Sequence, residues 1–170
     1  MIVRPAVLSD ARGIAEVHVR SWQAAYRGLM PQDVLDALSI DDRADRWRSI
    51  IADPHPLTIG TLVAESDERI IGWVSFGAGR DEGTDAEGEV YGIYSDPGFW
   101  SRGVGHALIV AAEAALIAAG NRTGFLWVLD GNERADGFYE RHGWAADGST
   151  KLDERPGMTL RENRRVRRLR

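Results

Sequence analysis

The chain has 170 residues, a formal net charge of −5, 44% hydrophobic and 28% charged residues, and no cysteine. These values are typical of one globular domain, and the missing cysteine excludes disulfides, thiolate metal sites and a cysteine nucleophile. The N-terminus carries no apolar run of signal-peptide length, and no segment has the length of a membrane span. We therefore expect one cytoplasmic domain over residues 1–170, with neither a membrane partner nor a metal.

The first third of the chain is predicted to be a strand followed by helices. Residues Ile2–Ala6 read as a short strand, and Ser9 is suited to cap the helix that follows. Further helices are predicted at Pro31–Leu38 and Asp41–Ile51, and Pro54-His55-Pro56 ends the helical region. The first helix shows the spacing of a core-facing stripe at Ile14, Val17, Ser21, Trp22 and Ala25.

The rest of the chain alternates strands and helices. An acidic, glycine-rich surface loop is expected over residues 77–88. Helices are predicted after Gly103, ending at Gly120, and at Asn132–Arg141. Strands are predicted at Thr58–Glu65, Ile70–Phe76, Glu89–Ser95 and Thr123–Leu129, from Gly143-Trp144 onward, and within Met158–Leu169. This order predicts a mixed α/β (α+β) fold.

The most informative stretch is residues 93–106, where a strand runs through a proline turn and a glycine loop into an alanine-rich helix. Free N–H groups and the dipole at a helix N-terminus favour an anion, and a phosphate is the natural ligand. Gly103 and Gly105 allow unusual backbone angles and close approach. The dinucleotide fingerprint fails because residue 108 is Leu, and no Gly-Lys-Ser/Thr follows as in a P-loop.

A second motif specifies the ligand. Residues 132–144 have the form N-x-x-A-x-x-F-Y-x-x-x-G-[FW], about thirty residues after the loop at 100–105. Together these motifs resemble the GCN5-related N-acetyltransferase (GNAT) superfamily, which binds acetyl-coenzyme A. Trp100 replaces the usual Gln or Arg and Ser95 the usual strand valine, but backbone amides do most of the loop's work, so we expect binding to persist.

The resemblance implies a mostly antiparallel mixed sheet with a V-shaped splay between its central strands, flanked by helices, with a bulge near Gly92. It implies that Tyr139 is the general acid near the sulfur, that residues 102–106 hold the pyrophosphate and that the strand edge at 93–95 pairs with pantetheine. The coenzyme contacts implied are Ile93, Tyr94, Ser95, Ser101, Arg102, Gly103, Val104, Gly105, His106, Asn132 and Phe138.

The reaction also needs a base. A lysine-like amine has a pKa near 10.4, so only about one molecule in a thousand is unprotonated at neutral pH. Glu89 lies six residues before Ser95, at the position of the general-base glutamate in the histone-acetyltransferase branch of the superfamily. Simple alternation would put Glu89 on one strand face with Tyr91 and Ile93. The acceptor-site candidates are Trp22, Tyr26, Phe76 and Tyr91.

The function predicted on this basis is direct, acetyl-CoA-dependent N-acetylation of a small-molecule amine. Two alternatives stay open: a protein lysine or N-terminal acetyltransferase, which needs an open peptide groove, and a non-catalytic acyl-CoA-binding regulatory module, which would tolerate loss of Tyr139 and Glu89. The six arginines in residues 161–170 suggest nucleic acid, but the net charge favours an exposed strand instead. The sequence leaves open whether the chain forms a homodimer.

Overall fold

The protein is described by a computed structural model of residues 1–54, 56–81, 83, 87–155 and 157–170. Seven strands form one sheet in the order β1-β2-β3-β4-β5-β7-β6. Neighbouring strands are antiparallel except for the parallel pair β4 and β5. The strands are β1 (Ile2–Pro5), β2 (Thr58–Ser66), β3 (Arg69–Ala78), β4 (Gly88–Ser95), β5 (Thr123–Leu129), β6 (Ala145–Arg155) and β7 (Met158–Arg168).

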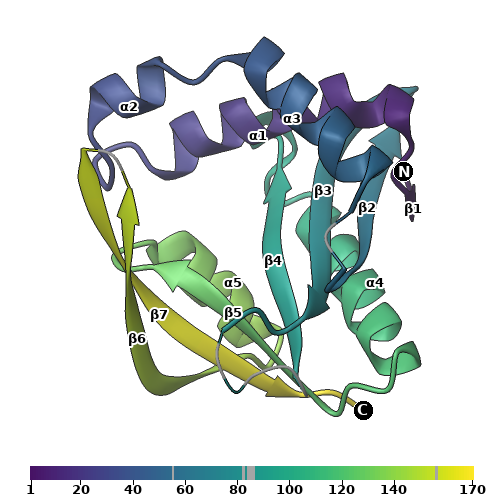
Figure 1. Cartoon of the computed structure of the whole chain (residues 1–170), viewed down its shortest axis with the longest axis vertical. Coiled ribbons are helices and arrows are strands. Elements are labelled where there is room, and N and C mark those ends of the chain that lie inside the picture. Colours follow the sequence, from purple (N-terminus) through teal and green to yellow (C-terminus); the bar gives the residue numbers. More distant parts are fainter. Residues whose placement is uncertain (55, 82, 84–86, 156) are drawn as a thin grey trace.

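Helices cover both faces of this sheet (Figure 1). On one face, α4 packs on the central strands in a core that contains Val74, Leu108 and Leu126. On the other face, α1 and α3 pack on β2 and β3 around Ala15 and Trp47. The helices are α1 (Ala11–Ala25), α2 (Gln32–Asp36), α3 (Ile40–Ala52), α4 (Val104–Ala118) and α5 (Glu133–Arg141), with 3₁₀ turns at Leu8–Asp10 and Pro97–Phe99.

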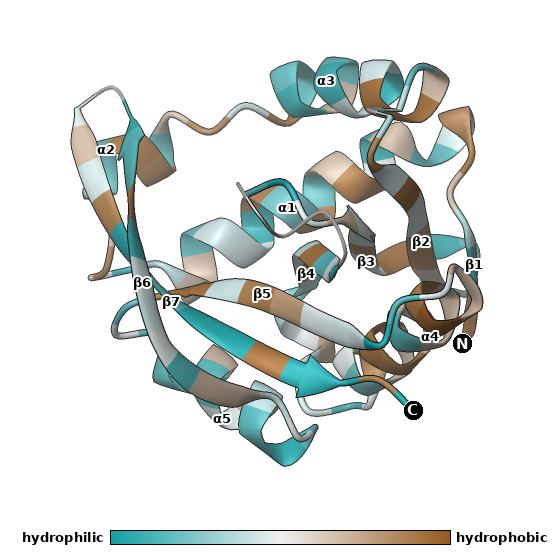
Figure 2. Cartoon of the chain, turned by 60° about the horizontal axis from the view of Figure 1, so that its bottom comes forward, coloured by the Kyte–Doolittle hydropathy of each residue, from teal (hydrophilic) through white to brown (hydrophobic). Residues whose placement is uncertain are grey.

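Hydropathy follows this arrangement. Figure 2 shows α4 as largely hydrophobic and β7 as mostly hydrophilic. The two faces of α4 differ little in hydropathy because the helix is apolar along most of its length, whereas β7 buries only Leu160 and Arg165. The expected mixed α/β fold with a mostly antiparallel sheet is confirmed.

Two predicted boundaries are wrong. Ser9 does not cap α1, because residues Leu8–Asp10 form a 3₁₀ turn and the Asp10 carboxylate instead accepts from the Val7 N–H at 2.8 Å. The strand expected from Gly143 begins at Ala145, since Gly143 has a φ of +77° and ends the preceding helix. His55 in the predicted proline break, and residues 82 and 84–86 in the acidic loop, lie outside the described residues.

The predicted splay is present at the centre of the sheet. β4 and β5 are paired only at Gly88–Gly124 and Glu89–Phe125. Beyond these pairs the two strands diverge, as Figure 1 shows for the teal and green arrows. Among the described residues, the β5-facing edge of β4 beyond Glu89 therefore has no strand partner, and it can bind an extended ligand through its backbone groups.

A β-bulge sits where the splay opens. Ser75 is paired with Gly92 and Phe76 with Val90, so Tyr91 is an extra residue in β4. Val90 and Ile93 consequently both contact the α4-side core, although they are three residues apart. The alternation that placed Glu89 and Ile93 on the same face is therefore wrong, because the bulge reverses the faces.

Within the described ranges, no helix is long and apolar enough to cross a membrane. In the same residues no group of three or more His, Asp or Glu side chains is arranged to hold a metal ion.

Candidate active site

A cleft of about 910 Å³ opens between the splayed strands β4 and β5. It extends from the N-terminus of α4 and from α5 to the C-terminal end of α1 and the β6–β7 hairpin. Fourteen residues predicted for the site line it together: Trp22, Tyr26, Glu89, Tyr91, Ile93, Tyr94, Ser95, Ser101, Gly103, Gly105, His106, Asn132, Phe138 and Tyr139.

Three predicted site residues do not line the cleft. Phe76 is 1% exposed and lies in the α4-side core, so its prediction as an acceptor residue is wrong. Its face of β3 is the one that packs on α4. The Val104 side chain is buried in the same core. The Arg102 guanidinium lies over the Phe99 ring at 5.7 Å, so at these two positions only a backbone role fits the prediction.

The N-terminus of α4 presents free backbone donors to the cleft. Gly103 caps the helix in the left-handed conformation with a φ of +83°, without a side-chain cap, and Ser101 also has a positive φ of 60°. The first backbone bond of the helix runs from the Ala107 N–H to the Gly103 carbonyl at 3.0 Å. Among the described residues, no backbone carbonyl accepts from the N–H groups of residues 102–106, which suits a bound phosphate.

Gly105 has a packing role as well. A Cβ built at this glycine would lie 3.1 Å from Cε2 of Phe138 on α5. The absent side chain therefore lets α5 approach the beginning of α4, and the two coenzyme motifs are joined here. Phe138 in turn contacts His142, whose ring nitrogen Nε2 lies 3.0 Å from Nδ1 of His106.

Positive charge surrounds this end of the cleft. The Arg134 guanidinium stacks over the Trp100 ring at 3.7 Å, and Arg134 and Arg141 both line the cleft. Burial lowers the pKa of Arg134, and the neighbouring Arg141 lowers it further. Trp100 Nε1 donates to the Ser95 carbonyl at 3.0 Å. Trp100, which replaces the usual Gln or Arg of the loop, thus anchors the end of β4 and stacks against the Arg134 guanidinium.

Asn132 and Tyr139 lie in the wall formed by α5. The Asn132 Oδ1 accepts from the Ala135 N–H at 3.2 Å and caps the helix, while the described residues leave its Nδ2 group without a partner. Tyr139 is 8% exposed, and burial raises the pKa of its hydroxyl well above the usual range. The phenol is therefore protonated throughout the physiological pH range and can act as a proton donor.

Glu89 is buried and tightly held. Its side chain is 2% exposed and forms an ion pair with Arg80 at 2.7 Å. The carboxylate also accepts from the Arg80 backbone N–H at 2.9 Å and from Nε at 3.2 Å. Three of its roughly four acceptor positions are occupied, and one is left for an amine or a water molecule.

The opposite end of the cleft is built from side chains. The Tyr26 and Tyr94 hydroxyls are hydrogen-bonded at 2.8 Å, and burial raises the pKa of both phenols. Glu162 of β7 also lines this end, and burial raises the pKa of its carboxyl group. The Lys151 ammonium lies 3.8 Å from the Glu162 carboxylate.

Sequence reasoning missed several lining residues. Arg134 lies inside the second motif, so the motif itself marked its position. Glu162, Lys151 and Arg155 come from the β6–β7 hairpin, which reaches the cleft by pairing with β5. Charged residues on alternate strand positions are typical of any exposed hairpin, so the sequence carried no signal for these three.

The chain is similar in sequence to known acetyltransferases. Residues 18–144 match the sequence model of the Acetyltransferase (GNAT) family. The chain is 34% identical over 131 residues to an uncharacterised N-acetyltransferase, YuaI, of Bacillus subtilis, covering 76% of this chain and 72% of that one. It is also 34% identical over 137 residues to mycothiol acetyltransferase of Acidimicrobium ferrooxidans, covering 72% of this chain but only 44% of the relative.

Solved structures share the fold. A GCN5-related N-acetyltransferase of Rhodopseudomonas palustris has a TM-score of 0.78 at 21% identity, covering 99% of this chain and 95% of that one. The PaiA N-acetyltransferase of Thermoplasma acidophilum, solved in complex with coenzyme A, has a TM-score of 0.69 at 18% identity, with 98% of both chains covered.

The family model and the curated relatives are those of acetyltransferases, so the protein is an acyltransferase. The family match and the YuaI relationship together show that the chain belongs to the GNAT acetyltransferase family.

Proposed function

We propose that this protein transfers the acetyl group of acetyl-CoA directly to the amine of a small molecule, and that residues 1–170 act as one catalytic unit. The observation that carries the proposal is the meeting, in one cleft, of free N–H groups at the start of α4, the unpaired edge of β4, and the Tyr139 phenol. The first two fit a pyrophosphate and an extended pantetheine chain. The third fits a thiol leaving group.

The chemistry divides between two side chains. The amine attacks the thioester carbonyl carbon, the carbon–sulfur bond breaks, and the thiolate must be protonated. Tyr139 is buried and protonated, so it supplies that proton. The amine must lose one proton in exchange, and we propose Glu89 as its acceptor, held in place by its ion pair with Arg80. The chain has no cysteine, which excludes an acyl-cysteine intermediate and supports direct attack by the amine.

Apolar packing at the acceptor end supports a small acceptor rather than a protein. Leu160 of the β6–β7 hairpin belongs to one buried apolar cluster with Trp22 and Tyr26 of the α1 region and Leu35 of α2. A peptide strand would need an open groove between these elements. The relative from Acidimicrobium ferrooxidans is named after the small molecule mycothiol and not after a protein substrate.

A turnover screen tests the proposal. Release of free thiol from acetyl-CoA is followed with a panel of small amines, and in parallel with lysine-containing and free N-terminal peptides. We expect turnover with small amines and little with peptides. Equal or better turnover with peptides would favour the protein acetyltransferase, and coenzyme binding without any turnover would favour the regulatory module.

A further inference from the structure

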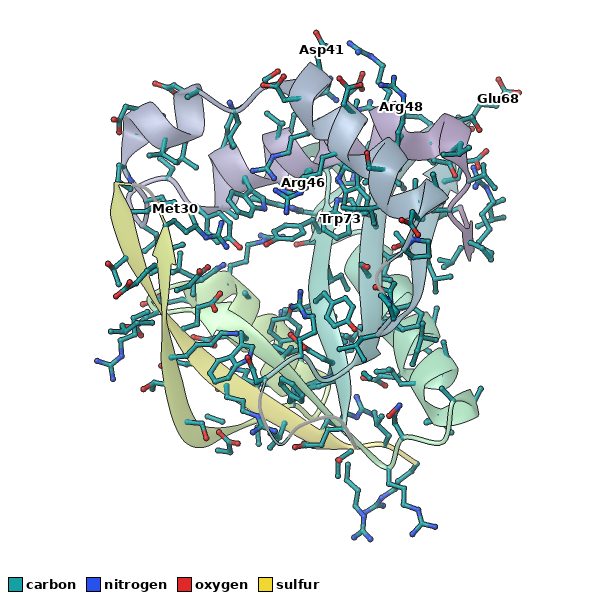
Figure 3. All side chains as sticks on the ribbon, in the orientation of Figure 1. Met30, Asp41, Arg46, Arg48, Glu68 and Trp73 are labelled. Atoms are coloured by element: carbon teal, nitrogen blue, oxygen red, sulfur yellow. The ribbon has the colours of Figure 1, made fainter. Side chains whose placement is uncertain are left out.

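Cationic side chains gather at the acceptor end, around Trp22 of α1. The Arg43 guanidinium of α3 lies 5.4 Å from the Trp22 ring centre, and that of Arg155, at the end of β6, lies 5.6 Å from it. Arg46 is one turn after Arg43, and Figure 3 shows it on the side of α3 that turns toward the centre of the molecule. Trp22 and Arg155 line the cleft itself, and Arg43 approaches the cleft wall at Trp22.

These arginines are poorly neutralised. Arg155 pairs with Asp153 at 2.6 Å, but no carboxylate among the described residues lies within 4 Å of Arg43 or Arg46. Arg43 is half-buried, and burial together with Arg46 and Arg155 lowers its pKa. Two further positive charges near a partly buried arginine are energetically unfavourable unless a bound anion compensates them.

The outward side of the same helix behaves differently. Arg48 pairs with Asp45 within α3, and Asp41 at the start of α3 pairs with Arg12 of α1 at 2.7 Å. The exposed Arg48 and Arg12 are thus matched by carboxylates, whereas the half-buried Arg43 beside Trp22 is not. Arg48 provides a control position on the same helix, five residues after Arg43.

Buried donors next to these arginines also lack acceptors. Trp47 Nε1 donates to Nδ1 of His18 at 3.3 Å, so the neutral His18 ring carries its hydrogen on Nε2. His18 Nε2 and Trp73 Nε1 are buried without a partner in the part of the chain that is described. Both are donors, and both rings lie in one aromatic cluster with Trp22. Donors and cations together, without an acceptor, indicate an anion or its hydration water.

We propose that the acceptor amine also bears an anionic group, a carboxylate or a phosphate, which binds Arg43 and Arg155 beside Trp22. This inference rests on the proposed N-acetyltransferase function and narrows its substrates to amino acids or amino phosphates. A lysine side chain or an uncharged amine offers nothing to these guanidiniums. A carboxylate or phosphate is matched by their planar fork of donors.

Matched amine pairs test the proposal. Thiol release is measured for an α-amino acid against the amine formed by removing its carboxylate, and for phosphoethanolamine against ethanolamine. We expect kcat/KM to be at least tenfold higher for the anionic member of one pair, since a hydrogen bond to a charged group contributes about one to two powers of ten. The pair that shows the preference identifies the anion. Equal values in both pairs would overturn the inference.

Three variants separate the outcomes. In Arg43→Gln and Arg155→Gln the preference ratio should fall toward one, whereas Arg48→Gln should keep the wild-type ratio. A ratio that is unchanged in Arg43→Gln and Arg155→Gln would contradict the site.

A binding measurement serves if no amine is turned over. Inorganic phosphate is titrated by calorimetry in the presence of saturating coenzyme A, whose own phosphate site is then filled. Binding that is lost in Arg43→Gln and kept in Arg48→Gln supports the anion site even if the proposed acetylation fails. No binding to wild-type protein, together with no turnover, would contradict both.

Discussion

The two ends of the cleft are built from different material. At the coenzyme end, the free groups are backbone amides at the start of α4 and the unpaired edge of β4. At the acceptor end they are side chains from α1, α3 and the β6–β7 hairpin, among them Arg43, Arg155 and Glu162. Backbone groups are the same for every sequence that adopts the fold, whereas side chains change with each substitution. The first end therefore defines the reaction, and the second selects the acceptor.

The largest effect is expected where these two ends meet. Tyr139→Phe removes the phenol without changing the packing of α5, and kcat should fall by about 10²–10⁴-fold. Calorimetry should show coenzyme affinity close to wild type. Tyr91→Phe is the matched variant, since the Tyr91 hydroxyl is bonded to the carbonyls of Leu57 and Ala78, and its effect should be far smaller. A Tyr139→Phe enzyme with wild-type kcat would remove the phenol from the mechanism.

The base lies at the same junction. Glu89→Gln should lower kcat/KM by about 10²-fold at neutral pH and make turnover more dependent on high pH, where more amine is unprotonated. Glu162→Gln is the comparison, because Glu162 is the other carboxylate at the acceptor end. The pH profiles of the two variants are measured with the same amine. If only Glu162→Gln changes the profile, the proton goes to Glu162 and our assignment of Glu89 fails.

The acceptor end should also determine acid sensitivity. Burial and the nearby arginines lower the pKa of His18 from 6.5 to about 3. Between these values the unfolded chain binds one proton more than the folded chain. The contribution of His18 to the free energy of unfolding is therefore present in full above pH 6.5 and is lost as the pH falls. The free energy of unfolding should fall by at most about 1.4 kcal/mol per pH unit, which amounts to roughly 2 kcal/mol by pH 5. Chemical unfolding of wild type and His18→Gln over this range measures it, and equal slopes would be the contrary result.

The smallest effect is expected at the coenzyme end. Gly103→Ala puts a Cβ on a residue with a φ of +83°, in open space, and should cost about 1 kcal/mol of stability through backbone strain alone. Gly105→Ala is unstrained but places its Cβ 3.1 Å from Phe138. We expect Gly103→Ala to lower the melting temperature, and Gly105→Ala to act chiefly on coenzyme affinity by displacing Phe138. Thermal melts and calorimetry on both variants distinguish strain from displacement.

Predictability from sequence followed the same division. The glycine loop and the N-x-x-A-x-x-F-Y motif located the coenzyme end because backbone conformation leaves a mark on local sequence. The bulge at Tyr91 was expected near Gly92, but its consequence for the faces of β4 was missed, since one extra residue inverts a period-two pattern. Phe76 was misplaced for a different reason: residue type alone cannot say which sheet face an aromatic residue occupies.

The charged acceptor end could not be derived. Arg43 and Arg155 are separated by more than a hundred residues, and only the pairing of β6 with β7 and of β7 with β5 brings them to one tryptophan. The cluster is a property of long-range topology. No local pattern distinguishes its arginines from those that merely cover the surface.

Asp96 directly follows β4, and its carboxylate is shared by several elements. It accepts from Arg69 at 2.7 Å, from Arg20 of α1 at 3.2 Å and from the Gly98 N–H at 2.9 Å. The segment that leads into α4 is thereby immobilised at its root before any ligand arrives. This segment loses its conformational freedom during folding. The phosphate-facing amides are therefore already in place, and ligand binding need not order them.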